Sequence, residues 1–233
     1  MLSRVLEPEA MDTAEEALDY DTIDHAEVNR RFAADLLTAL ADGQPGDGAT
    51  ERHLLDLGTG TAQIPIELLR QARTANRAAG LKISAVDLAA EMLVLAKRNV
   101  AAAGMNDVIR LERLDAKTLP YPDGRFDGVV SNSIVHHIPE PGEALAEAVR
   151  VTRSGGLLFF RDLCRPDDLD ALDRLVTLHA AGSNERQRQL FAQSLHAALS
   201  VDEIRGLVAA LGFDPATVRQ STDRHWTWSA RKA

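Results

Sequence analysis

The stretch that decides the fold is Leu54-Leu55-Asp56-Leu57-Gly58-Thr59-Gly60-Thr61-Ala62-Gln63. An apolar run ends in two closely spaced glycines, and a helical pattern begins directly after them. Gly58 and Gly60 permit backbone conformations that a side chain would block, so a ligand can approach the free N–H groups at the start of the helix. The segment therefore predicts a strand, a tight turn and a helix, with a small-molecule cofactor at the turn.

Two common nucleotide-binding patterns fit this turn poorly. The dinucleotide fingerprint is Gly-x-Gly-x-x-Gly, and Gln63 stands where its third glycine would be. This bulky polar side chain disfavours NAD and FAD, so an NAD-dependent oxidoreductase is the less favoured alternative. No Gly-Lys-Ser/Thr follows the turn, which argues against a Walker-type phosphate loop.

Strand-like and helical patterns alternate on the C-terminal side of the turn. Strands are predicted over residues 53–57, 82–87, 108–114, 126–131 and 157–161, and helices over 62–78, 90–103 and 142–152. Such alternation predicts parallel pairing through right-handed crossovers, with helices on both faces of an open sheet. Residues 216–221 and 224–230 predict a closing antiparallel hairpin at a sheet edge, with Trp226 and Trp228 on one face.

The length of 233 residues fits one domain. We expect N-terminal helices and a linker over 1–48, a cofactor-binding core over 49–162, a helical insertion over 163–199, and a C-terminal helix with the hairpin over 200–233. Helical periodicity in residues 12–41 and a cluster of helix breakers in 42–48 support the first division.

Charge and composition exclude several classes of protein. With 35 Asp and Glu against 26 Lys and Arg, the formal charge is −9, which disfavours nucleic acid as a partner. The single cysteine, Cys164, can form neither an intrachain disulfide nor a multi-cysteine metal site. The first residues carry no signal-peptide pattern, and no apolar run approaches the ~18 residues of a membrane span. We therefore expect a cytoplasmic protein with no membrane span.

Residues 56–62 resemble the first motif of the class I S-adenosylmethionine-dependent methyltransferases, with Ala62 where many members have a third glycine. Ala85-Val86-Asp87 resembles the second motif, in which the carboxylate accepts both ribose hydroxyls. Leu114-Asp115-Ala116 resembles the third, in which an acidic side chain takes the adenine amino group. Residues 126–132 and 154–158 resemble the fourth and fifth strands, so the resemblance runs in order from Leu54 to Arg161.

The resemblance implies a Rossmann-like, doubly wound, seven-stranded and mostly parallel sheet with an antiparallel last strand and an N-terminal helical lid. It implies S-adenosyl-L-methionine as the cofactor and S-adenosyl-L-homocysteine as its product. The implied cofactor-binding residues are Asp56, Gly58, Thr59, Gly60, Asp87, Leu88, Asp115, Ala116, Ser131 and Asn132.

The methyl acceptor is expected beside the segment that follows the fourth strand, because methyl transfer requires acceptor and methyl group to be aligned. His136 or His137 could remove a proton from the acceptor, although each also fits a packing role. Further residues that could contact the acceptor or cover the cofactor are Tyr20, Asp24, His25, Ser133 and Arg161. Two adjacent histidines without a third ligand do not indicate a metal site, so none is predicted.

The segment after the fourth strand also lacks the Asn/Asp-Pro-Pro-Tyr/Phe motif of the methyltransferases that act on nucleobase amines or glutamine. We therefore predict an enzyme that methylates a small organic acceptor. A peptide or protein acceptor, and a non-catalytic module that binds the cofactor, are the alternatives.

Overall fold

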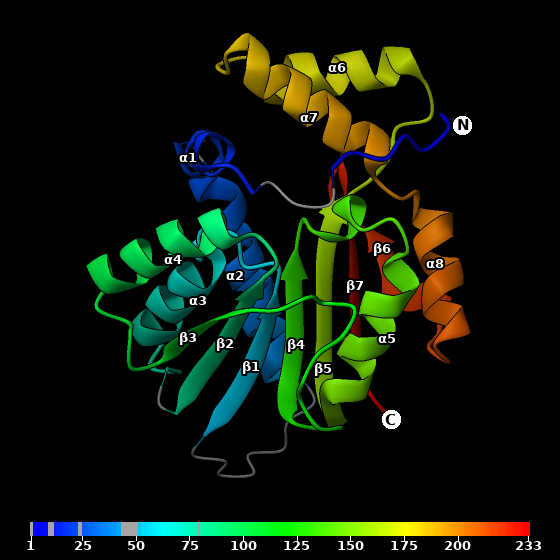
Figure 1. Ribbon diagram of the computed structural model, residues 1–233. Helices are drawn as coiled ribbons and strands as arrows, with labels where there is room; N and C mark the ends of the chain where they lie inside the picture. Colours follow the sequence, from blue (N-terminus) through cyan, green and yellow to red (C-terminus); the bar gives the residue numbers. More distant parts are fainter. Residues whose placement is uncertain (1, 9–11, 23–24, 43–50, 79) are drawn as a thin grey trace.

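The computed structural model describes residues 2–8, 12–22, 25–42, 51–78 and 80–233. Within them, seven strands form one sheet in the order β3-β2-β1-β4-β5-β7-β6 (Figure 1). The strands are β1 (Arg52–Leu57), β2 (Leu81–Asp87), β3 (Ile109–Arg113), β4 (Phe126–Asn132), β5 (Thr152–Leu163), β6 (Val218–Gln220) and β7 (His225–Arg231). β7 is antiparallel to both of its neighbours, and the other pairs are parallel. The predicted Rossmann-like sheet with a reversed last strand is confirmed.

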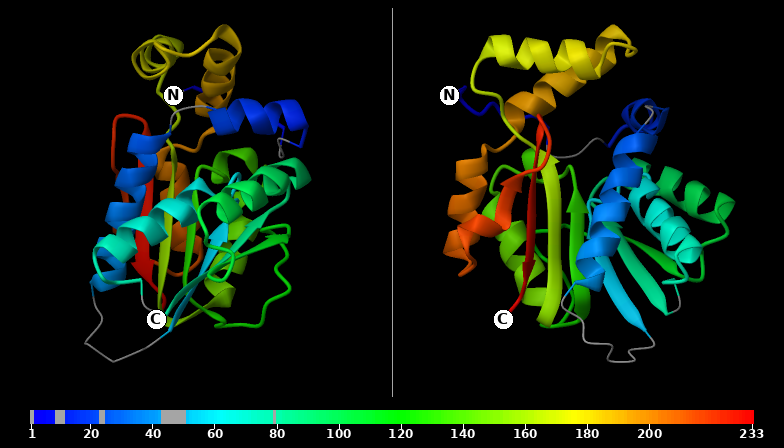
Figure 2. Two further views of the ribbon diagram at one scale, coloured as in Figure 1. Left: turned by 90° about the vertical axis from the view of Figure 1, so that its left-hand side faces the viewer. Right: turned by 180° about the vertical axis from the view of Figure 1, so that it is seen from behind.

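Helices cover both faces of the sheet (Figures 1 and 2). On one face lie α2 (Ala26–Ala41), α3 (Gln63–Thr74) and α4 (Ala90–Ala102), and on the other α5 (Pro141–Val151) and α8 (Val201–Ala210). Above the carboxyl ends of the parallel strands lie α1 (Ala14–Thr22), α6 (Leu169–His179) and α7 (Glu185–Ala197). Two short 3₁₀ helices are η1 (Val135–His137) and η2 (Pro215–Thr217).

Alternation along each strand builds two separate cores. Leu54 packs with the helices of the first face, whereas Leu55 and Leu57 pack with those of the second, because neighbouring side chains of a strand point to opposite faces. Trp226 and Trp228 are both fully buried in the second core, on one face of β7 as predicted.

Three predicted elements, β5, β6 and α3, begin or end two or more residues away from their observed bounds. β5 begins five residues early, at Thr152, because the chain pairs with β4 as soon as α5 ends, and a bulge opposite Phe126 absorbs the shift in register. β6 is shorter than predicted because residues 215–217, which begin with a proline, form η2. α3 ends at Thr74 and not at residue 78, because Asn76 takes a left-handed conformation that ends the helix.

The predicted linker falls mostly on residues 43–50, which lie outside the described residues. Among the helices of the described residues, none combines the length and the apolar character that crossing a bilayer would need.

Candidate functional site

The glycine turn between β1 and α3 is shaped by contacts that only glycine permits. Gly58 and Gly60 have φ angles of +68° and +54°, a region that favours glycine. A Cβ on Gly58 would lie 1.9 Å from a side-chain carbon of Ile134. The N–H of Gly60 donates to Oδ2 of Asp87 at 2.7 Å, and the N–H of Thr59 donates to the Val86 carbonyl at 2.9 Å. The turn is therefore tied to the carboxyl end of the neighbouring strand.

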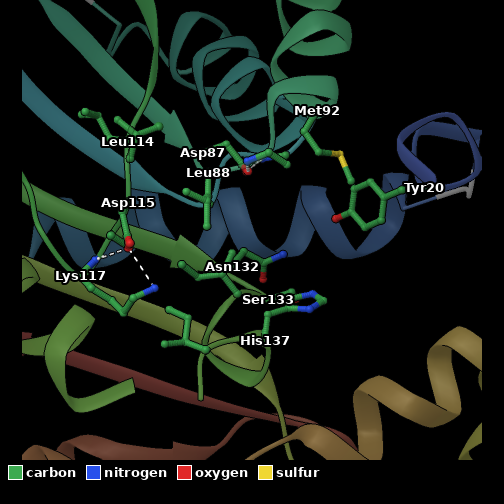
Figure 3. A pocket seen from close by; sticks show the side chains of 17 residues that line it. Tyr20, Asp87, Leu88, Met92, Leu114, Asp115, Lys117, Asn132, Ser133 and His137 are labelled. Atoms are coloured by element: carbon green, nitrogen blue, oxygen red, sulfur yellow. Dashed lines mark hydrogen bonds and ion pairs between the residues drawn. The ribbon is translucent and has the colours of Figure 1, made fainter. Parts of the chain in front are cut away.

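A pocket, here called the loop pocket, opens over this turn (Figure 3). Residues predicted to bind the cofactor form much of its wall, namely Gly58, Gly60, Asp87, Leu88, Asp115 and Ala116. Asp115 accepts the Lys117 N–H at 2.9 Å and lies 3.1 Å from that residue's Nζ, which orients its carboxylate. The carboxyl ends of β1, β2 and β3 thus contribute to one concave surface, as expected for the ligand edge of an open α/β sheet.

A smaller cavity beside the turn contains polar atoms without partners. Oδ2 of Asp56, Oγ1 of Thr61 and Oδ1 of Asn132 are buried and have no hydrogen-bond partner among the described residues, and all three residues line this cavity. Burial raises the pKa of Asp56 to about 7; the Thr59 side chain opposes this rise, and the nearby charge of Asp87 adds to it. Because buried polar groups without partners are costly, this arrangement fits a polar, positively charged ligand group.

Helix α1 covers the turn. Cε1 of Tyr20 lies 3.7 Å from the position that a Cβ on Gly60 would occupy, and burial raises the pKa of Tyr20 to about 12. Oδ1 of Asp21 accepts from Nε2 of Gln63 at 3.2 Å and from Nδ2 of Asn99 at 3.0 Å. The bulky residue at the third-glycine position thus anchors the helix that covers the site.

A second and larger cavity, here called the upper cavity, lies between the glycine turn and α7. Its volume is about 350 Å³, within the range of roughly 300–1,000 Å³ that is typical of small-molecule sites. Four residues line both this cavity and the loop pocket, namely Tyr20, Asn132, Ser133 and His137. The two spaces therefore adjoin at the segment that follows β4. His25 also lines the upper cavity, and its ring centroid lies 5.0 Å from that of Tyr20.

Glu7, His136 and His137 meet on the wall of the upper cavity, and the buried carboxylate of Asp162 contacts His136. Nδ1 of His136 lies 2.5 Å from Oδ1 of Asp162, and Oδ2 of Asp162 accepts the backbone N–H groups of Val135 and His136. Oε1 of Glu7 lies 3.3 Å from Nε2 of His136 and 3.0 Å from Nδ1 of His137.

These groups shift one another's protonation. Burial favours the neutral form of His136, but Asp162 and Glu7 outweigh it and raise the pKa of that imidazole. Burial, together with the neighbouring His136, lowers the pKa of His137 to about 3. Burial raises the pKa of Glu7. His137 is therefore neutral at physiological pH, and His136 is the more basic of the two rings.

The N-terminal segment brings Glu7 to this place. Arg4 donates from Nη2 to the carbonyls of His136 and Ile138 at 3.1 and 3.0 Å, and from Nε to the Ala197 carbonyl at 2.7 Å. These hydrogen bonds hold residues 2–8 between η1 and the end of α7. The carboxylate of Glu7 thereby becomes part of the wall of the upper cavity.

Comparison with known proteins agrees with this geometry. Residues 55–160, which include the second half of β1, the glycine turn and most of β5, match the family described as "Methyltransferase domain". Residues 55–160 therefore form a methyltransferase domain of the class I S-adenosylmethionine-dependent family.

The 27-O-demethylrifamycin SV methyltransferase of Amycolatopsis mediterranei is 28% identical to this chain over 77% of the chain and 61% of the relative's own length. A demethylmenaquinone methyltransferase of Symbiobacterium thermophilum is 32% identical over 53% of the chain and 45% of its own length. The chain thus spans less than two thirds of both relatives. The solved structure of a methyltransferase from Aquifex aeolicus, 16% identical, superposes with a TM-score of 0.65 over 95% of this chain and 99% of the other, which shows the shared fold.

The loop pocket and the cavity beside it fit the cofactor of this family. Carboxylates of Asp87 and Asp115 line the space where the second and third motifs place them. Oδ2 of Asp56 is buried next to the turn and has no hydrogen-bond partner in the part of the chain that the structure describes. Thr59 lines the same small cavity. These groups match a ligand that carries hydroxyls, an amine and an ammonium.

Two residues predicted for the methyltransferase site lie elsewhere. Oγ of Ser131 donates to the Leu57 carbonyl at 2.9 Å, and this buried side chain lines neither the loop pocket nor the upper cavity. Nη2 of Arg161 lies 2.7 Å from Oδ2 of Asp35, and its Nε donates to Oγ1 of Thr227. Arg161 points toward α2, because side chains of β5 alternate between the faces, and we do not retain it as an acceptor contact. Asp24 lies outside the described residues.

The sequence analysis missed Glu7 and Asp162. Asp162 stands at the carboxyl edge of the sheet, next to the end of the predicted fifth strand, so the rule that singled out Asp87 could have found it. Glu7 has no comparable signal, because only the path of the N-terminal segment brings it to η1.

Proposed function

We propose that this methyltransferase transfers the methyl group of S-adenosylmethionine to a small organic acceptor held in the upper cavity. The observation that carries the proposal is the adjoining pair of spaces, in which Tyr20, Asn132, Ser133 and His137 line both. One space fits the cofactor, and the other is large enough for a small organic molecule.

The residues around the glycine turn would hold the cofactor. Asp87 would accept from the ribose hydroxyls, Asp115 from the adenine amino group, and Asp56 from the ammonium at the other end. When bound, the cofactor supplies an electrophilic methyl group on a sulfonium. Tyr20 and α1 exclude water from the turn, and the shared wall of the two spaces aligns the acceptor for in-line transfer.

The histidine cluster lies on the acceptor side of this arrangement. An acceptor that carries a proton must lose it during transfer. His136 and His137 are two of the imidazoles that line the upper cavity, and His137 also belongs to the shared wall. Asp162 orients His136 in the manner of a carboxylate that holds a catalytic imidazole.

The walls of the upper cavity favour a small, partly apolar acceptor. Leu163, Leu190 and Phe191 contribute apolar surface, and segments from both ends of the chain enclose the space. The two relatives described above act, by their names, on a demethylrifamycin and on demethylmenaquinone, which are small molecules. An extended peptide would need a more open groove.

Methyl-labelled S-adenosylmethionine tests the proposal. The full chain is incubated with separate small-molecule and protein fractions of its source cell, and both fractions are analysed for label. We expect label in a small molecule. Label confined to protein would support the peptide alternative, and no label with either fraction, despite cofactor binding, would support a non-catalytic module. Calorimetric binding of NAD but not of S-adenosylhomocysteine would overturn the cofactor assignment.

Once a labelled small molecule is in hand, His137→Ala tests the acceptor side. We expect turnover to fall by about 10²–10⁴-fold, the scale of a disrupted proton transfer, because His137 lines the shared wall and its ring centroid lies 4.2 Å from that of the more basic His136. Affinity for S-adenosylhomocysteine should not change. Turnover within about twofold of wild type would remove His137 from the mechanism. His196→Ala, which replaces an α7 histidine that lines neither space, is the control.

A further inference from the structure

Three side chains on the wall of the upper cavity bring ligand atoms to one point. One ligand atom from each of Glu7, His136 and His137 lies within 4.8 Å of the other two. The carboxylate comes from the N-terminal segment and the two imidazoles from η1. All three residues border the upper cavity.

The close contacts within this cluster are not hydrogen bonds. Oε1 of Glu7 and Nδ1 of His137 are 3.0 Å apart, yet both are buried and neither has a hydrogen-bond partner among the described residues. The other oxygen of Glu7, Oε2, accepts from Oγ of Ser194 at 3.2 Å, which holds the carboxylate in place. A buried oxygen and a buried nitrogen left without partners are costly, and a cation between them would satisfy both.

The surroundings of His136 orient a ring nitrogen toward the same point. When the ring is neutral and its Nδ1 donates to Asp162 at 2.5 Å, the lone pair of Nε2 faces Oε1 of Glu7 at 3.3 Å. A histidine that binds a metal usually donates its other ring N–H to a carboxylate in this way. Only 8% of the Glu7 side chain and 4% of the His136 side chain are exposed, so water does little to solvate these groups.

We propose that Glu7, His136 and His137 bind one divalent transition-metal ion, with zinc as the ion that fits best. Zn–N and Zn–O bonds of about 2.0–2.2 Å in a tetrahedral site place neighbouring ligand atoms about 3.3 Å apart. The two contacts of Glu7 Oε1, at 3.3 and 3.0 Å, match that spacing. Two imidazoles with one carboxylate suit zinc, whereas magnesium and calcium prefer oxygen ligands.

Three protein ligands leave one position of a tetrahedral ion open, as in catalytic rather than structural zinc sites. Since the cluster borders the upper cavity, this position is accessible to an oxygen or nitrogen atom of the acceptor. Binding of the ion does not depend on the proposed methyl transfer. Only the acceptor at the open position rests on the proposed function. In this role His137 holds the ion and does not itself take up the proton.

Metal binding can be measured without cofactor or acceptor. The full chain, freed of any affinity tag, is stripped with a chelator, dialysed and titrated with ZnCl₂ by calorimetry, and with CoCl₂ by visible absorption. We expect one ion per chain and the absorption bands of tetrahedral cobalt. Glu7→Gln and His137→Asn should each weaken binding by at least about tenfold, and MgCl₂ should not compete.

His179→Asn is the matched control, because Nε2 of His179 lies 2.6 Å from Oδ2 of Asp223 at the same cavity and belongs to no three-ligand cluster among the described residues. It should bind zinc as the wild type does. Circular dichroism and affinity for S-adenosylhomocysteine show whether each variant is folded. Glu7→Gln changes the N-terminal segment that Arg4 holds in place, whereas His137→Asn leaves that segment unchanged, so the second variant tests the site independently.

The metal site would be overturned if the wild type failed to bind zinc, or if Glu7→Gln and His137→Asn bound zinc as tightly as the wild type does. Either result would leave the proposed methyl transfer standing. Conversely, stoichiometric zinc binding without any methyl transfer would sustain the site and overturn the proposed function.

Discussion

Asp87 has two tasks at the glycine turn. Its oxygens accept the backbone N–H groups of Gly60 and Ala89 at 2.7 and 2.9 Å, and the residue also lines the loop pocket. We expect Asp87→Ala to weaken binding of S-adenosylhomocysteine by more than about tenfold through lost charge-assisted hydrogen bonds, measured by calorimetry. Asp127→Ala is the control, because Asp127 binds His53 and Arg153 away from the pocket. Equal affinities of the two variants would contradict the assignment.

Asp56 predicts how cofactor affinity depends on pH. Its pKa in the free protein is raised to about 7 by burial, and an ammonium beside it would lower that pKa. Binding below pH 7 must therefore release a proton, so affinity for S-adenosylmethionine should fall as pH falls, by up to about tenfold per unit. Calorimetry in buffers of different ionisation enthalpy measures the released proton.

The raised pKa of Asp56 also makes the stability of the fold depend on pH, in the direction opposite to that of cofactor affinity. Because the folded pKa of Asp56 lies above its usual value of 3.8, the neutral form favours folding, and stability is lost as pH rises toward 7. Asp56→Asn should abolish the proton release on binding. Persistence of the full proton release in that variant would assign it to another group, such as Asp87, whose pKa burial also raises.

At the scale of elements, Asp21 holds α1 over the glycine turn. It accepts from Gln63 of α3 and Asn99 of α4, so the lid is tied to both helices that flank the cofactor. We expect Asp21→Ala to speed hydrogen exchange in residues 14–22 and to weaken cofactor binding by about 1 kcal/mol per lost hydrogen bond. Glu27→Ala, at an exposed ion pair of α2, should change neither. Unaltered exchange in α1 would show that packing alone holds the lid.

At the scale of the whole molecule, Arg161 joins α2 to the sheet. Its guanidinium lies 5.6 Å from the ring centroid of Phe32 and 5.8 Å from that of Phe159, and it binds Asp35 and Thr227. We expect Arg161→Met to lower the free energy of unfolding by about 1–3 kcal/mol, measured by urea denaturation, and to leave turnover unchanged. A fall in turnover with unchanged stability would restore Arg161 as an acceptor contact.

The sequence by itself determined the sheet, the cofactor edge and the family. These depend on local signals: alternation of apolar residues sets the faces of each strand, and a glycine pair between a strand and a helix sets the turn. Parallel crossovers then place the ends of neighbouring strands at one edge, so Asp87 and Asp115 could be assigned to the same pocket before their contacts were known.

Only the tertiary structure decided what surrounds the acceptor. Glu7 reaches His136 and His137 because the N-terminal segment passes between η1 and α7, and Arg161 turns to Asp35 because α2 packs across β5. No periodicity encodes such contacts, since they join segments far apart in the chain whose meeting depends on how whole elements pack. Local patterns specify which face a side chain occupies, and the packed fold specifies what that side chain meets there.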